Sequence, residues 1–179
     1  MKRFSCIVAT GITALVLSIQ VAHSGGDKGG DGGPSGAFSY SKDATVAAEQ
    51  RKVKAVVERY QDGLNSSDFA KIRPLFASDA VAEWNEKATV LGADAIAKPY
   101  EDLFKAVKFN TDFQYDAIDV YGDMAIVRTH HPVRQTELIL KDMSKKLDFN
   151  REIFVLRRLD GDWKIILYTF NTQPRQGEQ

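Results

Sequence analysis

The chain has 179 residues, of which 44% are hydrophobic and 27% are charged, a composition that suits one packed domain and hardly two. The chain has 24 basic and 24 acidic residues, so it lacks the excess of positive charge that is typical of proteins that bind nucleic acid. Cys6 is the only cysteine, which excludes an internal disulfide, and a domain of this length can be stabilised by its hydrophobic core alone.

The N-terminus has the pattern of a signal peptide. Two basic residues precede an apolar run over about residues 4–21, and small residues then provide a cleavage site before Gly25. The run is at or below the roughly 17–25 residues of a membrane-spanning helix, which favours cleavage over an uncleaved anchor. Loss of residues 1–24 removes two of the 24 basic residues and none of the 24 acidic ones, so the mature chain has a net charge of −2. We therefore predict a periplasmic or secreted protein with no membrane attachment after cleavage.

A glycine-rich segment follows the predicted cleavage site. Residues 25–42 begin with GGDKGGDGGPSG, which cannot bury apolar surface and is typical of a flexible linker. The folded domain is expected over residues 43–174, where Asp43 or Thr45 can cap the first helix. Residues 175–179 are expected to form a disordered tail.

The first half of the domain predicts three helices. Apolar residues recur at helical spacing from Val46 to Leu64, and GLNSSD then ends the first helix. A short second helix fits FAKIRPLF. The third helix follows Gly92 and contains Pro99 about one turn in, so it starts late or kinks. Between the second and third helices, ASDAVAEW at residues 77–84 changes to the alternation of a strand.

The second half of the domain predicts strands. Four segments have strand character, namely DFQYDAIDVY, MAIVRTHHPVRQTELIL, FNREIFVLRRL and WKIILYTFNT. Turn signals separate them: Gly122-Asp123 after the first, KDMSKK after the second and DGD after the third. Helices followed by strands indicate an α+β domain, in which one face of a curved antiparallel sheet covers the helices.

This order of elements, with VVERYQDGLNSSDFAKIRPLFASDAVAEW and RRLDGDWKIILY, resembles the nuclear transport factor two-like superfamily. That superfamily includes ketosteroid isomerases and SnoaL-like polyketide cyclases, and the resemblance covers about residues 44–172. It implies a cone-shaped, cystatin-like roll with three N-terminal helices packed on the sheet. The resemblance says little about the reaction, because proteins with unrelated functions share this fold.

The resemblance to ketosteroid isomerases covers only one of their three functional groups. Those enzymes use an aspartate base, a tyrosine and a protonated aspartic acid. In this sequence Tyr60 stands at the tyrosine position, but Trp84 replaces the base and Val155 replaces the second acid. Strand alternation turns Glu83 to the face opposite Trp84. Typical ketosteroid isomerase activity is therefore not expected.

The resemblance also implies which strand residues face the inside of the cone. It places Val155 inside, with Phe154 and Leu156 outside. In the strand that begins MAIVRTHH it turns His130 inward and His131 outward. A slip of one residue would exchange the two faces, including the two histidines.

The predicted pocket is an apolar cone with a few polar groups, as small-molecule sites usually are. The candidate catalytic residues are His130, because imidazole exchanges protons near neutral pH, and Tyr60, which can donate to a developing oxyanion. The other lining residues, which are expected to bind the ligand, are Trp84, Ile126, Arg128, Tyr168, Val155 and Phe170. We expect no metal and no other cofactor, because adjacent strand histidines point to opposite faces and no third ligand has suitable spacing.

Two functions fit this sequence. The favoured one is an exported SnoaL-like domain that binds a small, largely apolar molecule, because the sequence supplies a pocket more clearly than a reaction. The alternative is a metal-independent isomerase, cyclase or dehydratase that transfers a proton next to a carbonyl. Superfamily members commonly pair through the outer sheet face, so the resemblance implies a homodimer that uses Phe154 and Leu156.

Overall fold

The computed structural model describes residues 38–85, 87–131, 137–140, 142–147 and 149–172. The predicted signal peptide, the glycine-rich part of the linker and the predicted tail lie outside these residues. Within the described part of the chain, no helix is both long enough and apolar enough to cross a membrane.

The first helix, α1, spans Ala44–Asn65 and has Asp43 as its N-cap. The Asp43 carboxylate accepts hydrogen bonds from the backbone N–H groups of Thr45 at 2.8 Å and Val46 at 3.1 Å. Those N–H groups have no partner within the helix, so the Asp43 side chain satisfies them. Of the two predicted caps, Asp43 and Thr45, the structure therefore has Asp43. The buried face of α1 is lined by Val53, Val56, Val57, Tyr60 and Leu64.

The next helical elements pack against the end of α1. They are the short helix α2, Phe69–Ile72, and a 3-10 turn over Arg73–Leu75. A side chain at Gly63 would overlap the side chain of Ile72, so α2 can approach α1 this closely only because Gly63 has none. The helix α3 spans Ala93–Ala106 and contains the predicted internal proline.

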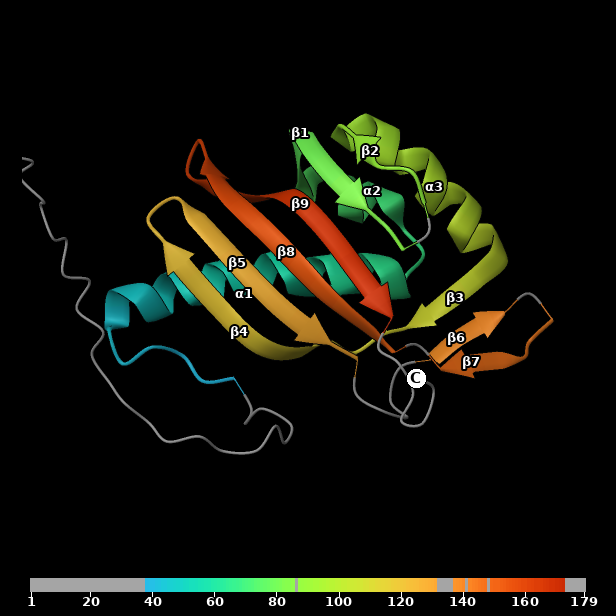
Figure 1. Cartoon of the computed structure of the whole chain (residues 1–179), viewed down its shortest axis with the longest axis horizontal. Coiled ribbons are helices and arrows are strands. Elements are labelled where there is room, and N and C mark those ends of the chain that lie inside the picture. Colours follow the sequence, from blue (N-terminus) through green and yellow to red (C-terminus); the bar gives the residue numbers. More distant parts are fainter. Residues whose placement is uncertain (1–37, 86, 132–136, 141, 148, 173–179) are drawn as a thin grey trace, which may run out of the picture. The chain divides into compact units, whose positions relative to one another are not determined.

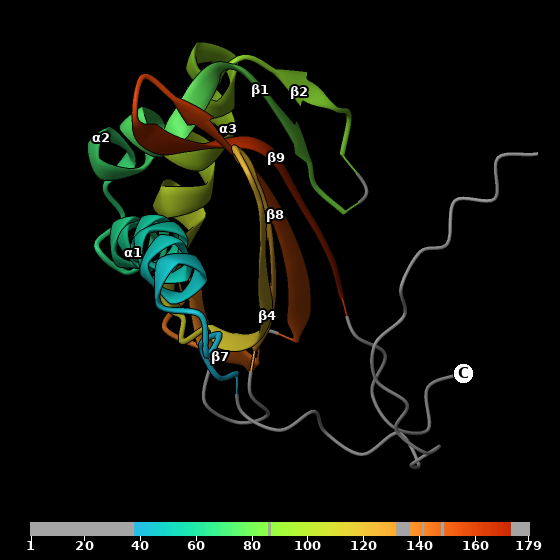
Figure 2. The same cartoon turned by 90° about the vertical axis from the view of Figure 1, so that its left-hand side faces the viewer.

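The strands form two sheets. The large sheet has the strand order β2-β1-β9-β8-β5-β4, and the small sheet has the order β3-β6-β7. The bounds are β1 Phe76–Glu83, β2 Val90–Leu91, β3 Val107–Asn110, β4 Gln114–Tyr121, β5 Met124–His130, β6 Glu137–Leu140, β7 Lys145–Leu147, β8 Asn150–Leu159 and β9 Asp162–Thr172. The helices lie on one face of the curved large sheet (Figures 1 and 2), and we call the space between them and this face the interior.

The prediction of an antiparallel sheet is wrong at one place. β1 pairs parallel with β9, whereas the other pairs in the large sheet are antiparallel. Because β1 and β9 are far apart in the sequence, no hairpin sets their relative direction. The segment MAIVRTHHPVRQTELIL also differs from its prediction as one strand, since its beginning is β5 in the large sheet and its end is β6 in the small one.

The inner face of β5 differs from the predicted one by one residue. Ala125, Val127 and Thr129 are buried, whereas Ile126 and Arg128 are exposed. The residues that were expected outside therefore face the helices, and the residues that were expected inside face outward.

β8 shows the same exchange. The buried residues of β8 are Glu152, Phe154 and Leu156. Ile153 is exposed, and Val155 lies on the same face of the strand as Ile153. The predicted inward position of Val155 is therefore wrong, and so are the predicted outward positions of Phe154 and Leu156. The physical reason is that both faces of β5 and β8 carry apolar residues, so alternation alone does not identify the inner face.

Candidate functional site

Aromatic rings from several elements meet in the interior. Tyr60 on α1 is 1% exposed, and its ring centroid lies 5.4 Å from that of Phe154 and 5.2 Å from that of Tyr168. Phe113, just before β4, stacks on Tyr60 at 6.2 Å. The rings surround Tyr60, so its phenol lies inside the protein and away from bulk solvent.

A hydrogen bond joins the hydroxyl groups of Tyr60 and Tyr100, which comes from α3. Burial raises the pKa of both phenols well above its usual value, and the neighbouring Tyr168 adds to this rise for Tyr60. Both phenols therefore stay protonated near neutral pH. Such a pair can donate a hydrogen bond from an O–H group to an oxygen atom that gains negative charge.

A carboxylate–imidazole pair lies in the same interior. The Oε1 atom of Glu152 is 2.7 Å from Nε2 of His131, and the two side chains are 1% and 3% exposed. The Thr129 hydroxyl donates a hydrogen bond of 2.8 Å to the other carboxylate oxygen. Burial of a carboxylate is costly unless it has such partners. Thr129 and His131 therefore make the inward position of Glu152 possible.

The phenol pair and the carboxylate–imidazole pair form one group, which we call the interior cluster: Tyr60, Tyr100, Thr129, His131 and Glu152. The charge of Glu152 contributes to the raised pKa of both phenols, so the carboxylate is within electrostatic reach of both hydroxyls. An imidazole beside a carboxylate can accept and release a proton, and the phenols can stabilise an oxyanion. The cluster therefore holds the groups that proton transfer next to a carbonyl requires.

Four of the predicted site residues lie in the interior or beside it. Tyr60 and Tyr168 are buried there. Phe170 is half-buried, and its ring centroid lies 6.0 Å from that of Tyr168. Trp84, directly after β1, is half-buried and meets the ring of Tyr100 edge-on at 5.6 Å. Trp84 therefore packs beside the phenol pair.

The other four predicted site residues face away from the interior. Ile126, Arg128 and Val155 lie on the outer face of the large sheet. His130 is half-buried on that face, where its Nδ1 atom lies 2.9 Å from Oδ1 of Asp116. The prediction that these four residues line the pocket is wrong, because the assumed register is one residue out of step with the observed one.

The remaining cluster members carry little signal in the amino-acid sequence. His131 is the histidine that a one-residue slip of the strand turns inward, and the alternation of side chains alone does not choose between the two registers. Glu152 carries no signal of burial, since a glutamate on a strand is usually solvated until its partners are known. Tyr100 falls on the apolar face of the third predicted helix, a position that is typical of packing.

The structure also bears on metal binding. Among the residues that it describes, no three His, Cys, Asp or Glu side chains are grouped as a metal site requires. His130 and His131 lie on opposite faces of the large sheet, which is the arrangement that makes adjacent strand histidines a poor chelate.

Comparison with protein families finds one match that spans most of the domain. The model of the SnoaL-like domain matches residues 57–166. Among proteins of curated function, none matches the chain.

Solved structures with the same fold include three of interest. A ketosteroid isomerase-like protein from Erwinia carotovora atroseptica has a TM-score of 0.63 and 21% identity, over 71% of this chain and 98% of that one. A candidate dehydratase of the NTF2-like family from Streptomyces avermitilis has a TM-score of 0.62 and 11% identity, over 72% and 98%. A nuclear transport factor 2-like superfamily protein from Salmonella enterica has a TM-score of 0.61 and 17% identity, over 73% and 95%. At these identities the similarity establishes the fold alone.

Proposed function

This chain belongs to the SnoaL-like domain family of the nuclear transport factor 2-like superfamily, and we propose that it is exported and binds a small, uncharged, largely apolar molecule in its interior. The observation that carries the proposal is the hydroxyl pair of Tyr60 and Tyr100, which lies among aromatic rings. Apolar walls with a few polar groups are typical of small-molecule sites. The buried polar side chains of the described residues include no lysine or arginine, which favours a ligand without negative charge.

Replacing Tyr60 with phenylalanine should weaken the binding of phenol, a small probe with one hydroxyl group. The expected loss is about two- to tenfold, because one hydrogen bond contributes about 0.5–1.5 kcal/mol. The measurement is an NMR titration of the mature chain. Tyr121→Phe is the matched control, since Tyr121 is 65% exposed and its hydroxyl should not matter. Unchanged affinity in Tyr60→Phe, or no binding by the unmodified protein, would contradict the proposal.

Proton transfer next to a carbonyl is the second candidate function, and the pair of His131 and Glu152 favours it. With Nε2 of His131 2.7 Å from the Glu152 carboxylate, Nδ1 is the nitrogen that would take a proton from the carbon beside the carbonyl. The electron pair left on that carbon would move to the carbonyl oxygen, and the phenols would stabilise the resulting oxyanion. Return of the proton to another position gives an isomerase, and loss of a leaving group gives a lyase.

Pairing of two copies through the outer face of the large sheet completes the proposal. An apolar stripe crosses four adjacent strands there, because Val81, Leu167, Val155 and Ile126 follow one another in register. Ile126 is 38% exposed and the nearby Ile153 is 39% exposed, which is uncommon for residues of this type in a monomer. This stripe takes the place of Phe154 and Leu156, whose burial removes them from any interface.

Val155→Asp should convert the mature protein from a dimer to a monomer, because a carboxylate in the middle of the stripe would be desolvated without a partner. Sedimentation equilibrium at micromolar concentration measures the mass, and circular dichroism checks that the fold is kept. Leu103→Asp on α3 is the control, since Leu103 is 39% exposed and the helices lie on the other face of the large sheet. A monomeric unmodified protein, or a dimeric Val155→Asp protein, would rule out this interface.

A further inference from the structure

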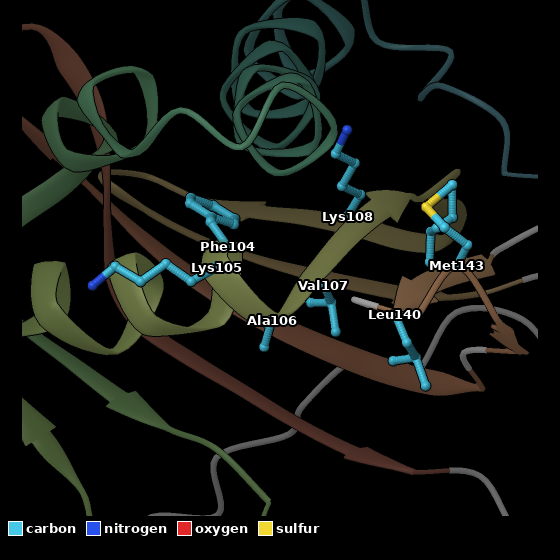
Figure 3. Close-up of a pocket in the computed structure, with 8 residues that line it drawn as sticks. Phe104, Lys105, Ala106, Val107, Lys108, Leu140 and Met143 are labelled. Carbon is cyan, nitrogen blue, oxygen red and sulfur yellow. The ribbon is translucent and has the colours of Figure 1, made fainter.

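A pocket of about 210 Å³ lies where the end of α3 meets β3 and β6 (Figure 3). Its apolar lining includes Phe104, Val107, Ile139, Leu140 and Met143. None of the interior cluster residues lines it. The pocket is therefore separate from the interior cluster, and the proposed function does not use it.

The pocket is too small to be a complete ligand site. Typical small-molecule sites enclose roughly 300–1,000 Å³, so a volume of about 210 Å³ suits one part of a ligand. Lys105 and Lys108 also line the pocket, but their ammonium groups extend away from Val107 and Leu140 (Figure 3). Lys105 pairs with Asp102 at 3.2 Å. The pocket therefore presents alkyl stems and apolar side chains, which suit an uncharged apolar group.

Phe104 connects this pocket with the interior cluster. It is half-buried and lines the pocket, and its ring centroid lies 5.7 Å from that of Tyr100. Tyr100 in turn shares a hydrogen bond with Tyr60. A single aromatic side chain therefore lies between the pocket and the phenol pair.

We propose that the pocket is an outer subsite for the ligand whose polar head binds at the phenol pair. The ligand class is then a neutral amphiphile with a hydroxyl or carbonyl head and an alkyl tail of several carbon atoms. Phe104 determines specificity, because the tail must pass it to enter the pocket. This inference rests on the proposed function, since without a head-group site in the interior there is no second part to bind.

The test compares phenol with 4-hexylphenol, which carries the same head and an added tail. The chain contains three methionines, and cleavage of the signal peptide leaves Met124 and Met143, so methyl-labelled methionine gives two NMR signals. The 4-hexylphenol should bind at least about tenfold more tightly than phenol, because the tail leaves water. It should also shift the Met143 signal saturably. The Met124 signal is an internal control on the outer sheet face and should not move.

Leu140→Gln should remove most of the affinity that the hexyl tail adds, and it should leave phenol affinity within about twofold. Leu91→Gln places the same change on an exposed residue of β2 and should keep the full gain. If phenol binds but the tail adds nothing, or adds as much in Leu140→Gln, the subsite is disproved and the interior site stands. If neither compound binds the unmodified protein, the proposed function fails and the subsite fails with it.

Discussion

Replacing Phe154 with alanine should lower the free energy of unfolding by about 3–5 kcal/mol, which is the usual cost of removing a buried phenylalanine ring. Phe154 is 0% exposed, and its ring centroid lies 4.8 Å from that of Tyr168 and 5.4 Å from that of Tyr60. The deletion therefore leaves a cavity in the middle of the interior, and the surrounding rings lose their packing partner. Urea unfolding at one protein concentration, followed by circular dichroism, measures the change.

The adjacent residue provides the matched control. Ile153 lies on the opposite face of β8 and is 39% exposed, so Ile153→Ala removes less buried surface than Phe154→Ala and should cost only about 1–2 kcal/mol. A loss in Ile153→Ala as large as that in Phe154→Ala would mean that the two faces of β8 are assigned the wrong way round. The pair therefore tests the register on which the whole site depends.

Replacing His131 with glutamine should reduce catalysed proton exchange by about 10²–10⁴-fold, the usual contribution of a general acid or base. The reaction to follow is deuterium uptake by cyclohexanone in D₂O, measured by NMR with the mature protein. Glutamine keeps an N–H group that can donate to Glu152, which limits the damage to the buried carboxylate. It cannot accept and release a proton as imidazole does.

His130→Gln is the control for this experiment, because it makes the same change one residue away. His130 lies on the outer face beside Asp116, so its replacement should leave the exchange rate unchanged. Loss of exchange in His130→Gln with activity retained in His131→Gln would reverse the assignment. Absence of exchange by the unmodified protein would leave small-molecule binding as the function and remove the catalytic candidate.

Features that depend on neighbouring residues in the chain could be predicted from the sequence. The helix that begins after Asp43 follows from an N-cap and from apolar residues at helical spacing. The hairpin at residues 160–162 follows from DGD, since Asp160 and Gly161 both adopt positive φ angles there. The inward position of Tyr60 follows from its place on the apolar face of α1. The superfamily was predicted correctly from the order of elements and from the resemblance of two stretches, VVERYQDGLNSSDFAKIRPLFASDAVAEW and RRLDGDWKIILY.

Most of the candidate site could not be predicted in this way. Val127 and Ile126, like Phe154 and Ile153, are neighbours of similar hydrophobicity, so both possible registers of β5 and β8 bury apolar side chains. The choice between them depends on what the inner face meets across the interior. There, the rings of Tyr60 and Phe113 pack on Phe154, and Thr129 and His131 partner the Glu152 carboxylate.

The sequence by itself determined the family, through the order of elements and the resemblance of two stretches. It also determined the first helix, the hairpins and the inward position of Tyr60, because capping, periodicity and turn chemistry act over a few residues. Only the tertiary structure decided that β1 runs parallel to β9, that His131 and not His130 faces inward, and that Tyr100 meets Tyr60. Each of these depends on contacts between residues that are distant in the chain or on a register that two faces of similar hydrophobicity leave open. A carboxylate such as Glu152 can be recognised as part of a site only when its buried partners are known.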